Sequence, residues 1–119
     1  MLLEKVVAGD IDGVRELIGC GVPLEGTDKL WQPLHSAALH GHYKITCLLL
    51  SHGASPNYPD DGGNTPLHYA CLFGHLELAL LLLDNGATLS SNSNGLTPLQ
   101  LCINPSHITA LQRHKNCST

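Results

Sequence analysis

An internal repeat of 33 residues constrains this chain more than any other feature of its sequence. The segment 32–42 recurs as 65–75, with the same Pro-Leu-His start and the same Gly-His end. Thr97 opens a further copy, and upstream Gly9 lies 32 residues before Gly41. Self-similarity at a fixed period of about 20 to 50 residues indicates a stack of repeated structural units. The chain therefore contains four copies, of which the first and the last are imperfect.

The third copy shows how one unit folds. Thr65 suits the N-cap of a helix, and Pro66 suits the first helical position, where no backbone N–H is needed. Gly74 ends this short helix, and a second apolar run with helical spacing follows it directly. Gly86 fits a left-handed C-cap, and turn-forming residues fill the segment before the next Thr-Pro pair. Each unit is predicted to be helix, turn, helix and hairpin.

One such unit cannot stand alone, because two short helices expose an apolar face that only a neighbouring unit covers. The small residues at 37–38 and 70–71 allow the first helices of adjacent units to approach closely. The leucine runs at 48–50 and 80–83 are expected to fill the layer between units. The core is therefore built by stacking.

The repeated motif resembles the ankyrin consensus over essentially the whole chain. The resemblance rests on Thr65-Pro66-Leu67-His68, Ala70, Gly74-His75, Leu81-Leu82-Leu83 and Gly86-Ala87. It implies an all-α fold, an ankyrin-repeat solenoid of stacked helix-turn-helix units joined by β-hairpin loops. We expect one domain over residues 1–119, with repeats at 1–26, 27–59, 60–92 and 93–119, the last serving as a C-terminal cap.

The outer copies depart from this pattern. The first copy lacks its hairpin and is polar on its outer side, as expected of an N-terminal cap or of a truncation at a repeat boundary. In the fourth copy Gln100 replaces His68, the second helix opens at Pro105, and the polar residues 112–115 stand where the third copy has leucines. A polar outer face suits a C-terminal cap.

The second copy departs at its hairpin. Gln32 replaces the capping threonine, which should weaken that helix start by about 1 kcal/mol. Leu30 replaces the turn glycine found at Gly63 and Gly95, and a branched residue does not easily hold a positive φ. The hairpin tip at 29–31 should therefore differ from the others.

Composition excludes several classes of protein. Six basic against ten acidic residues give a net charge of −4, which disfavours binding to nucleic acid. Five cysteines without a CxxC pair suit free thiols in a reducing compartment. No apolar run approaches the roughly 20 residues that span a bilayer, and none has signal-peptide length at the N-terminus. We expect a soluble, monomeric, intracellular protein of the cytoplasm and/or nucleus, without membrane insertion.

Eight histidines raise the question of a metal site, with His40 and His42, or His68 and Cys71, as imaginable ligands. A zinc site needs about four ligands that converge on one point, whereas these histidines recur once per repeat. The resemblance assigns His35 and its counterpart one repeat later to hydrogen bonds around the hairpin and helix start. No hydrolase, phosphate-loop or dinucleotide motif occurs. We predict no cofactor, no metal and no catalytic residue; a metal-binding or catalytic protein is the third-ranked alternative.

The resemblance implies a concave partner-binding groove formed by hairpin tips and by the exposed side of the first helices. Trp31 and Phe73 are the expected aromatic anchors, because aromatic side chains dominate binding energy at interfaces. Alternatively, Tyr69, Leu72 and Leu101 pack between adjacent helices. The predicted partner-binding residues are Lys29, Leu30, Trp31, Leu39, His40, Asn64, Tyr69, Leu72, Phe73, Leu96 and Leu101; Ser36, Gly62, Asn94 and Asn104 occupy further variable positions.

These features predict a non-catalytic protein–protein interaction module, acting as an adaptor, scaffold or inhibitor on a protein or peptide partner. The alternative is a regulatory ankyrin segment that acts in cis on an enzyme or channel domain absent from this chain. Asn57 lies in the loop position that some ankyrin proteins offer to an asparaginyl hydroxylase, with Leu49 eight residues before it. We therefore note Asn57 as a predicted hydroxylation site.

Overall fold

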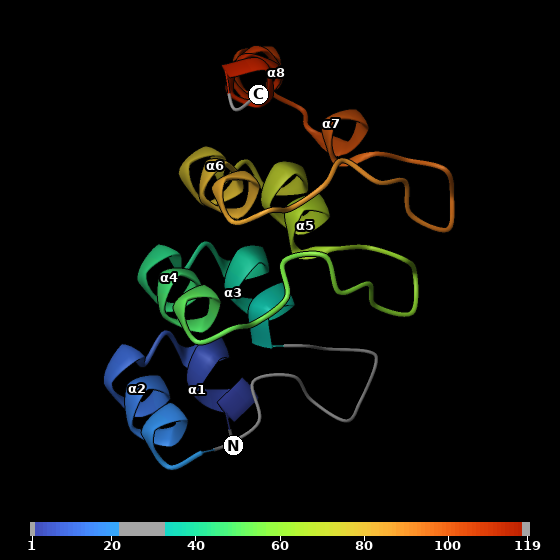
Figure 1. The fold of residues 1–119 in the computed structure, drawn as a ribbon. Helices are drawn as coiled ribbons and strands as arrows, with labels where there is room; N and C mark the ends of the chain where they lie inside the picture. Colours follow the sequence, from blue (N-terminus) through green and yellow to red (C-terminus); the bar gives the residue numbers. More distant parts are fainter. Residues whose placement is uncertain (1, 22–32, 118–119) are drawn as a thin grey trace.

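The computed structural model describes residues 2–21 and 33–117 as a stack of helix pairs (Figure 1). The first helices of the pairs lie in one column and the second helices in another, while the loops that follow α4 and α6 project to one side (Figure 1). The described residues contain helices and no β-strand, which confirms the predicted all-α solenoid. The helices are α1 (Leu2–Ala8), α2 (Ile11–Gly19), α3 (Pro33–His40), α4 (Tyr43–Ser51), α5 (Pro66–Leu72), α6 (Leu76–Asp84), α7 (Pro98–Leu101) and α8 (Pro105–Cys117).

The core lies between successive pairs, as the leucine runs predict. Alanines at 37–38 and at Ala70 are fully buried where the first helices meet. The largest buried apolar side chains come mostly from the second helices and from the start of α5; they are Leu49, Leu67, Leu78, Leu82 and Leu111. Because each pair contributes to the layer above and below it, no pair has a core of its own.

Histidines at the start of α3 and α5 connect each pair to the next hairpin. Nδ1 of His68 accepts from the Thr65 backbone N–H at 3.0 Å and from the Thr65 hydroxyl at 2.9 Å. Nε2 of the same ring donates to the Leu96 carbonyl oxygen at 3.0 Å. His35 makes the equivalent bond to the Asn64 carbonyl oxygen at 2.9 Å. The buried neutral imidazole therefore accepts a hydrogen bond at the start of its own helix and donates one to the following loop.

The turns inside the second and third pairs are held by a second set of histidines. Nε2 of His75 lies 3.2 Å from the Leu39 carbonyl oxygen of the preceding pair, and His42 lies 3.4 Å from the Val7 carbonyl oxygen. Gly41 has a φ of +72°, and a Cβ there would lie 2.7 Å from the His75 ring. Glycine is required at this turn both by its backbone angle and by the close approach of the next repeat.

The projecting loops are fastened to one another by side-chain amides. The Asn57 amide donates to the Gly86 carbonyl oxygen at 2.9 Å, and its oxygen accepts from the Thr88 backbone N–H at 2.8 Å and from the Thr88 hydroxyl at 3.2 Å. Asn92 donates to the Asn64 side chain at 2.8 Å. These bonds join the loop after α4 to the loop after α6.

Helix α7 is much shorter than α5. A residue that precedes proline is disfavoured in helical conformation, so Pro105 prevents α7 from continuing through Asn104. The chain leaves the helix at Cys102, whose φ of −71° and ψ of 122° are extended. Thr97 and Gln100 still form a reciprocal capping pair at the helix start, with Gln100 in the place of the histidine. The fourth copy therefore keeps the capped start of its first helix, α7, but lacks the C-terminal part of that helix.

We expect stability to fall in mildly acidic solution because of the buried histidines. Burial lowers the pKa of His68 below its usual 6.5, so the unfolded chain binds the proton more tightly than the folded one. Stabilisation by the neutral ring is complete above about pH 6.5 and is lost as the pH falls through the folded-state pKa. Burial also lowers the pKa of His35. Denaturant unfolding between pH 7.5 and pH 5, with values chosen around this window, measures the loss.

His68→Gln is the matched variant, since Gln100 performs the same helix-start bond without titrating. Its stability should depend less on pH than that of the unmodified chain. His52→Gln, which changes an exposed ring at the end of α4, is the control and should keep the original dependence. Equal pH dependence for His68→Gln and the unmodified chain would rule out this role for His68.

Asn57→Ala should destabilise the stack by about 1–2 kcal/mol, because it removes the amide that joins two loops. Asn85→Ala is the comparison, since the Asn85 amide donates only to Leu81 of its own helix, at 2.9 Å. Chemical denaturation of both variants gives the two free energies of unfolding. A loss for Asn57→Ala no larger than that for Asn85→Ala would show that the loop-to-loop bonds contribute nothing specific.

Candidate protein-binding surface

The side of the stack that carries α1, α3, α5, α7 and the loops before them exposes large apolar side chains. Phe73, directly after α5, is 52% exposed and Leu72 is 37% exposed. Leu96, in the loop before α7, is 36% exposed, and Ile103 after α7 is 80% exposed. We call this surface the first-helix face and define it by Leu72, Phe73, Leu96, Ile103 and the exposed ends of α1 and α3. Its apolar side chains are free to meet a partner.

Tyr69 is placed differently. Its ring is half-buried and meets the edge of the His35 ring at 5.8 Å between centroids, and its hydroxyl donates to the Asp60 carboxylate. The same carboxylate accepts from the backbone N–H groups of Gly62 and Asn64, each at 2.9 Å. Burial is the main cause that raises the pKa of Tyr69, followed by the bond to Asp60. The packing alternative is therefore observed for Tyr69, whose side chain fastens a loop to α5.

Three other predicted residues are also partly used inside the molecule. Leu39 and Leu101 are half-buried, and the half-buried Asn64 accepts a bond from the Asn92 amide. His40 is exposed and its ring stacks on His42 at 5.8 Å between centroids. A partner therefore meets His40 more readily than the two half-buried leucines.

One variable position was wrongly placed on the surface. Ser36 is only 2% exposed, because α3 is covered by α1 on one side and by α5 on the other. Its short side chain does not reach past these neighbours. The predictions at Lys29, Leu30 and Trp31 lie outside the described residues.

Three exposed large hydrophobic residues, Val7, Tyr43 and Ile103, were not predicted from the sequence, and Ile103 is the most exposed of them. By its place in the repeat it corresponds to Cys71 and Ala38, both buried. The early end of α7 removes it from the helix and leaves it at the surface. Pro105 is the sequence signal from which the early end of α7 could have been predicted, since the residue before a proline is disfavoured in a helix.

The titratable side chains of the described residues bear on whether the stack could carry out catalysis or bind a metal. Burial raises the pKa of Cys71 to about 12, so its thiol stays protonated and is a poor nucleophile. No cluster of three or more His, Cys, Asp or Glu side chains in the described ranges is arranged to hold a metal ion. Cys20, Cys47, Cys71 and Cys102 are free thiols. None of the helices described is long and apolar enough to cross a membrane.

Asn57, the predicted hydroxylation site, is exposed on the loop side. Both ends of its amide are engaged with the next loop, at Gly86 and Thr88. Its modification stays a prediction, which mass spectrometry of protein from cells tests by the mass of one added oxygen on Asn57.

Helix pairs stacked through short hairpin loops define a helical repeat protein, and this chain belongs to the ankyrin-repeat family. The family model described as three copies of ankyrin repeats matches residues 2–93 and 59–115. Ankyrin repeats generally mediate protein–protein interaction, and the family is generally non-catalytic. The chain is also similar to the 2-5A-dependent ribonuclease of Mus musculus, with 36% identity over 66 residues. That match covers 54% of this chain but only 9% of the ribonuclease.

Tyr69→Phe should lower stability by roughly 1.5–3 kcal/mol, since the lost hydroxyl donates to a carboxylate that organises the loop. Tyr43→Phe removes a hydroxyl from an exposed tyrosine on α4 and serves as the control. Thermal and denaturant unfolding compare the two variants. A Tyr69→Phe protein as stable as the control would show that the bond to Asp60 is not structural.

Proposed function

We propose that this chain is a non-catalytic interaction module that binds an apolar or amphipathic segment of a protein partner on its first-helix face. The observation that carries the proposal is the distribution of exposed apolar side chains. Among the described residues, six large hydrophobic side chains are exposed, and all except Tyr43 belong to the first helices or to their loops and ends; the five are Val7, Leu72, Phe73, Leu96 and Ile103. Exposed apolar side chains gathered on one side mark interaction sites.

Phe73 and Ile103 are the proposed anchors. Both follow the C-terminal ends of neighbouring first helices, α5 and α7, and both are more than half exposed. Burial of large apolar side chains at the centre of an interface supplies most of its binding energy. His40 is exposed at the corresponding end of α3 and adds a polar contact at the edge.

The chain's negative charge bears on the choice of partner. With ten acidic and six basic residues, it lacks the excess of lysine and arginine that phosphate backbones attract. A protein segment is therefore favoured over a nucleic acid. We propose a monomeric adaptor, scaffold or inhibitor that acts inside the cell, with Trp31 adding a further aromatic contact from the second repeat.

Affinity capture with quantitative mass spectrometry tests this function. The unmodified chain, a Phe73→Ser and Ile103→Ser double variant, and a His52→Ser control are used as baits in parallel. His52 is a suitable control because it is exposed directly after α4, which is a second helix. We expect a specific partner to be retained by the control and depleted at least about tenfold with the double variant, a loss of about 1.4 kcal/mol or more.

Unfolding measurements distinguish a loss of partner binding from a loss of folding in the double variant. Substitutions at exposed sites usually change stability by no more than about 0.5 kcal/mol, so the double variant should melt close to the unmodified chain. A Trp31→Ala and Phe73→Ala variant extends the test to the second repeat. The proposal fails if no captured protein depends on the first-helix face, or if these variants unfold many degrees lower.

A further inference from the structure

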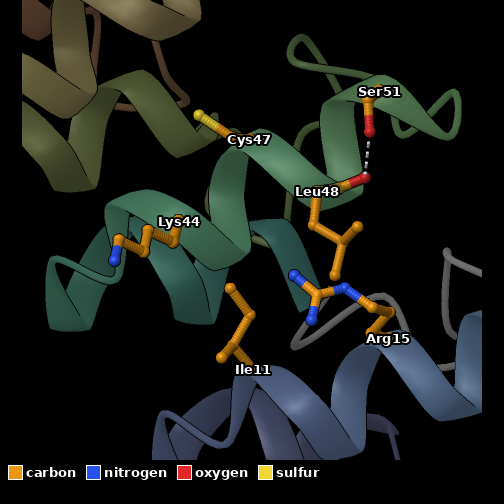
Figure 2. Close-up of a pocket in the computed structure, with 6 residues that line it drawn as sticks. All are labelled: Ile11, Arg15, Lys44, Cys47, Leu48 and Ser51. Carbon is orange, nitrogen blue, oxygen red and sulfur yellow. Dashed lines mark hydrogen bonds between the residues drawn. The ribbon is translucent and has the colours of Figure 1, made fainter.

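A separate depression lies on the opposite side of the stack, between the second helices α2 and α4. It has a volume of about 360 Å³. Ile11 rises from α2, Leu48 descends from α4, and the guanidinium of Arg15 reaches between them (Figure 2). Lys44, Cys47 and Ser51 complete the lining, and the Ser51 hydroxyl donates to the Leu48 carbonyl oxygen at 2.8 Å. The depression has apolar walls and two cationic side chains.

This depression continues along the stack. A second one, of about 250 Å³, shares Ile11 and Lys44 with the first and extends over Tyr43. A third, of about 220 Å³, shares Tyr43 with the second and reaches Glu77 on α6. The three depressions follow one another along α2, α4 and α6, and we call this row the second-helix furrow. A row of adjacent depressions suits an elongated segment better than a compact ligand.

Charge is unevenly distributed in the furrow. Lys44 forms no ion pair with any described residue, and Arg15 pairs only with Asp12, at 3.4 Å. That pair is weak, because its side chains are 62% and 91% exposed. Among the described residues that line the three depressions, Glu77 alone is acidic, and it lies at the α6 end. The lining of the α2–α4 end thus carries two cationic side chains, one of them paired with the exposed Asp12, on a chain whose net charge is −4.

We propose that the second-helix furrow binds an acidic amphipathic peptide segment of a partner protein. Its apolar side chains lie between Ile11 and Leu48, and its carboxylates meet Arg15 and Lys44. Charge complementarity selects the acidic segment, while the neighbouring Glu77 repels carboxylates at the far end and so fixes the direction of binding. This surface is independent of the first-helix face, because it is formed by the other column of helices.

A labelled peptide of Leu-Leu and Glu-Glu pairs in helical spacing, about four turns long, is the probe. Its lysine-for-glutamate counterpart is the peptide control, and fluorescence anisotropy measures both. We expect the acidic peptide to bind at low salt, to bind more weakly at about 0.3 M salt, and the basic peptide not to bind. Amide chemical shifts of the labelled protein should change in α2 and α4.

Arg15→Glu with Lys44→Glu is the test variant, and Lys5→Glu with Arg113→Glu is the control with the same change in net charge. The test variant should bind the acidic peptide at least about tenfold more weakly, and the control within about twofold. The Phe73→Ser and Ile103→Ser variant should bind it unchanged, which separates this inference from the proposed function.

Several results would overturn the inference. These are equal losses in test and control variants, shift changes confined to the first-helix face, or equal binding of the basic peptide. Sedimentation that shows a dimer broken by the test variant would assign the furrow to a second copy of the chain. Binding to phosphatidylserine vesicles without binding to the acidic peptide would assign it to a membrane surface, and either assignment would replace the peptide.

Discussion

The stack depends on the hydrogen bonds that a buried histidine makes at the start of a first helix. The ring of His68 accepts from the backbone of Thr65 and donates to the carbonyl of Leu96, so it joins the beginning of α5 to the loop of the following repeat. A neutral ring is needed for both bonds at once, since only one nitrogen carries the hydrogen. Burial favours that neutral form by lowering the pKa of His68. Local helix capping and the spacing between repeats are therefore decided by one side chain.

Stacking in this way leaves the two sides of the molecule with different chemistry. First helices approach closely through small residues such as Ala37 and Ala70, so their larger neighbours are displaced toward the surface. Phe73 is exposed on this side directly after α5, and Ile103 is exposed there because α7 ends early. Second helices bury longer side chains such as Leu49 and leave furrows between their ends. One side thus presents apolar projections, and the other presents shallow depressions with charged edges.

The loops contribute stability and not only a binding surface. Asp60 accepts from two backbone N–H groups of its own loop and from the Tyr69 hydroxyl. Asn57 and Asn92 then join one loop to the next. Because these polar groups are hydrogen-bonded to one another, the loops are ordered before a partner binds. Binding therefore costs less conformational entropy in the loops. Residues such as Tyr69 consequently support the surface without being its main contacts.

The sequence by itself determined the repeat and the helix pairs, because each depends on local chemistry or on the fixed period. The role of the repeated histidines was implied by the resemblance to the ankyrin consensus. The sequence also identified Phe73 as a large side chain at a variable position, and its exposure follows from the repeat register. Tertiary structure decided which variable positions are covered: Ser36 is buried between α1 and α5, and Tyr69 turns toward Asp60. It also decided that Arg15 and Lys44 line one depression between α2 and α4. These outcomes depend on contacts between residues distant in sequence, which a pattern within one repeat does not contain. The exposure of Ile103, in contrast, follows from the local effect of Pro105 on the end of α7.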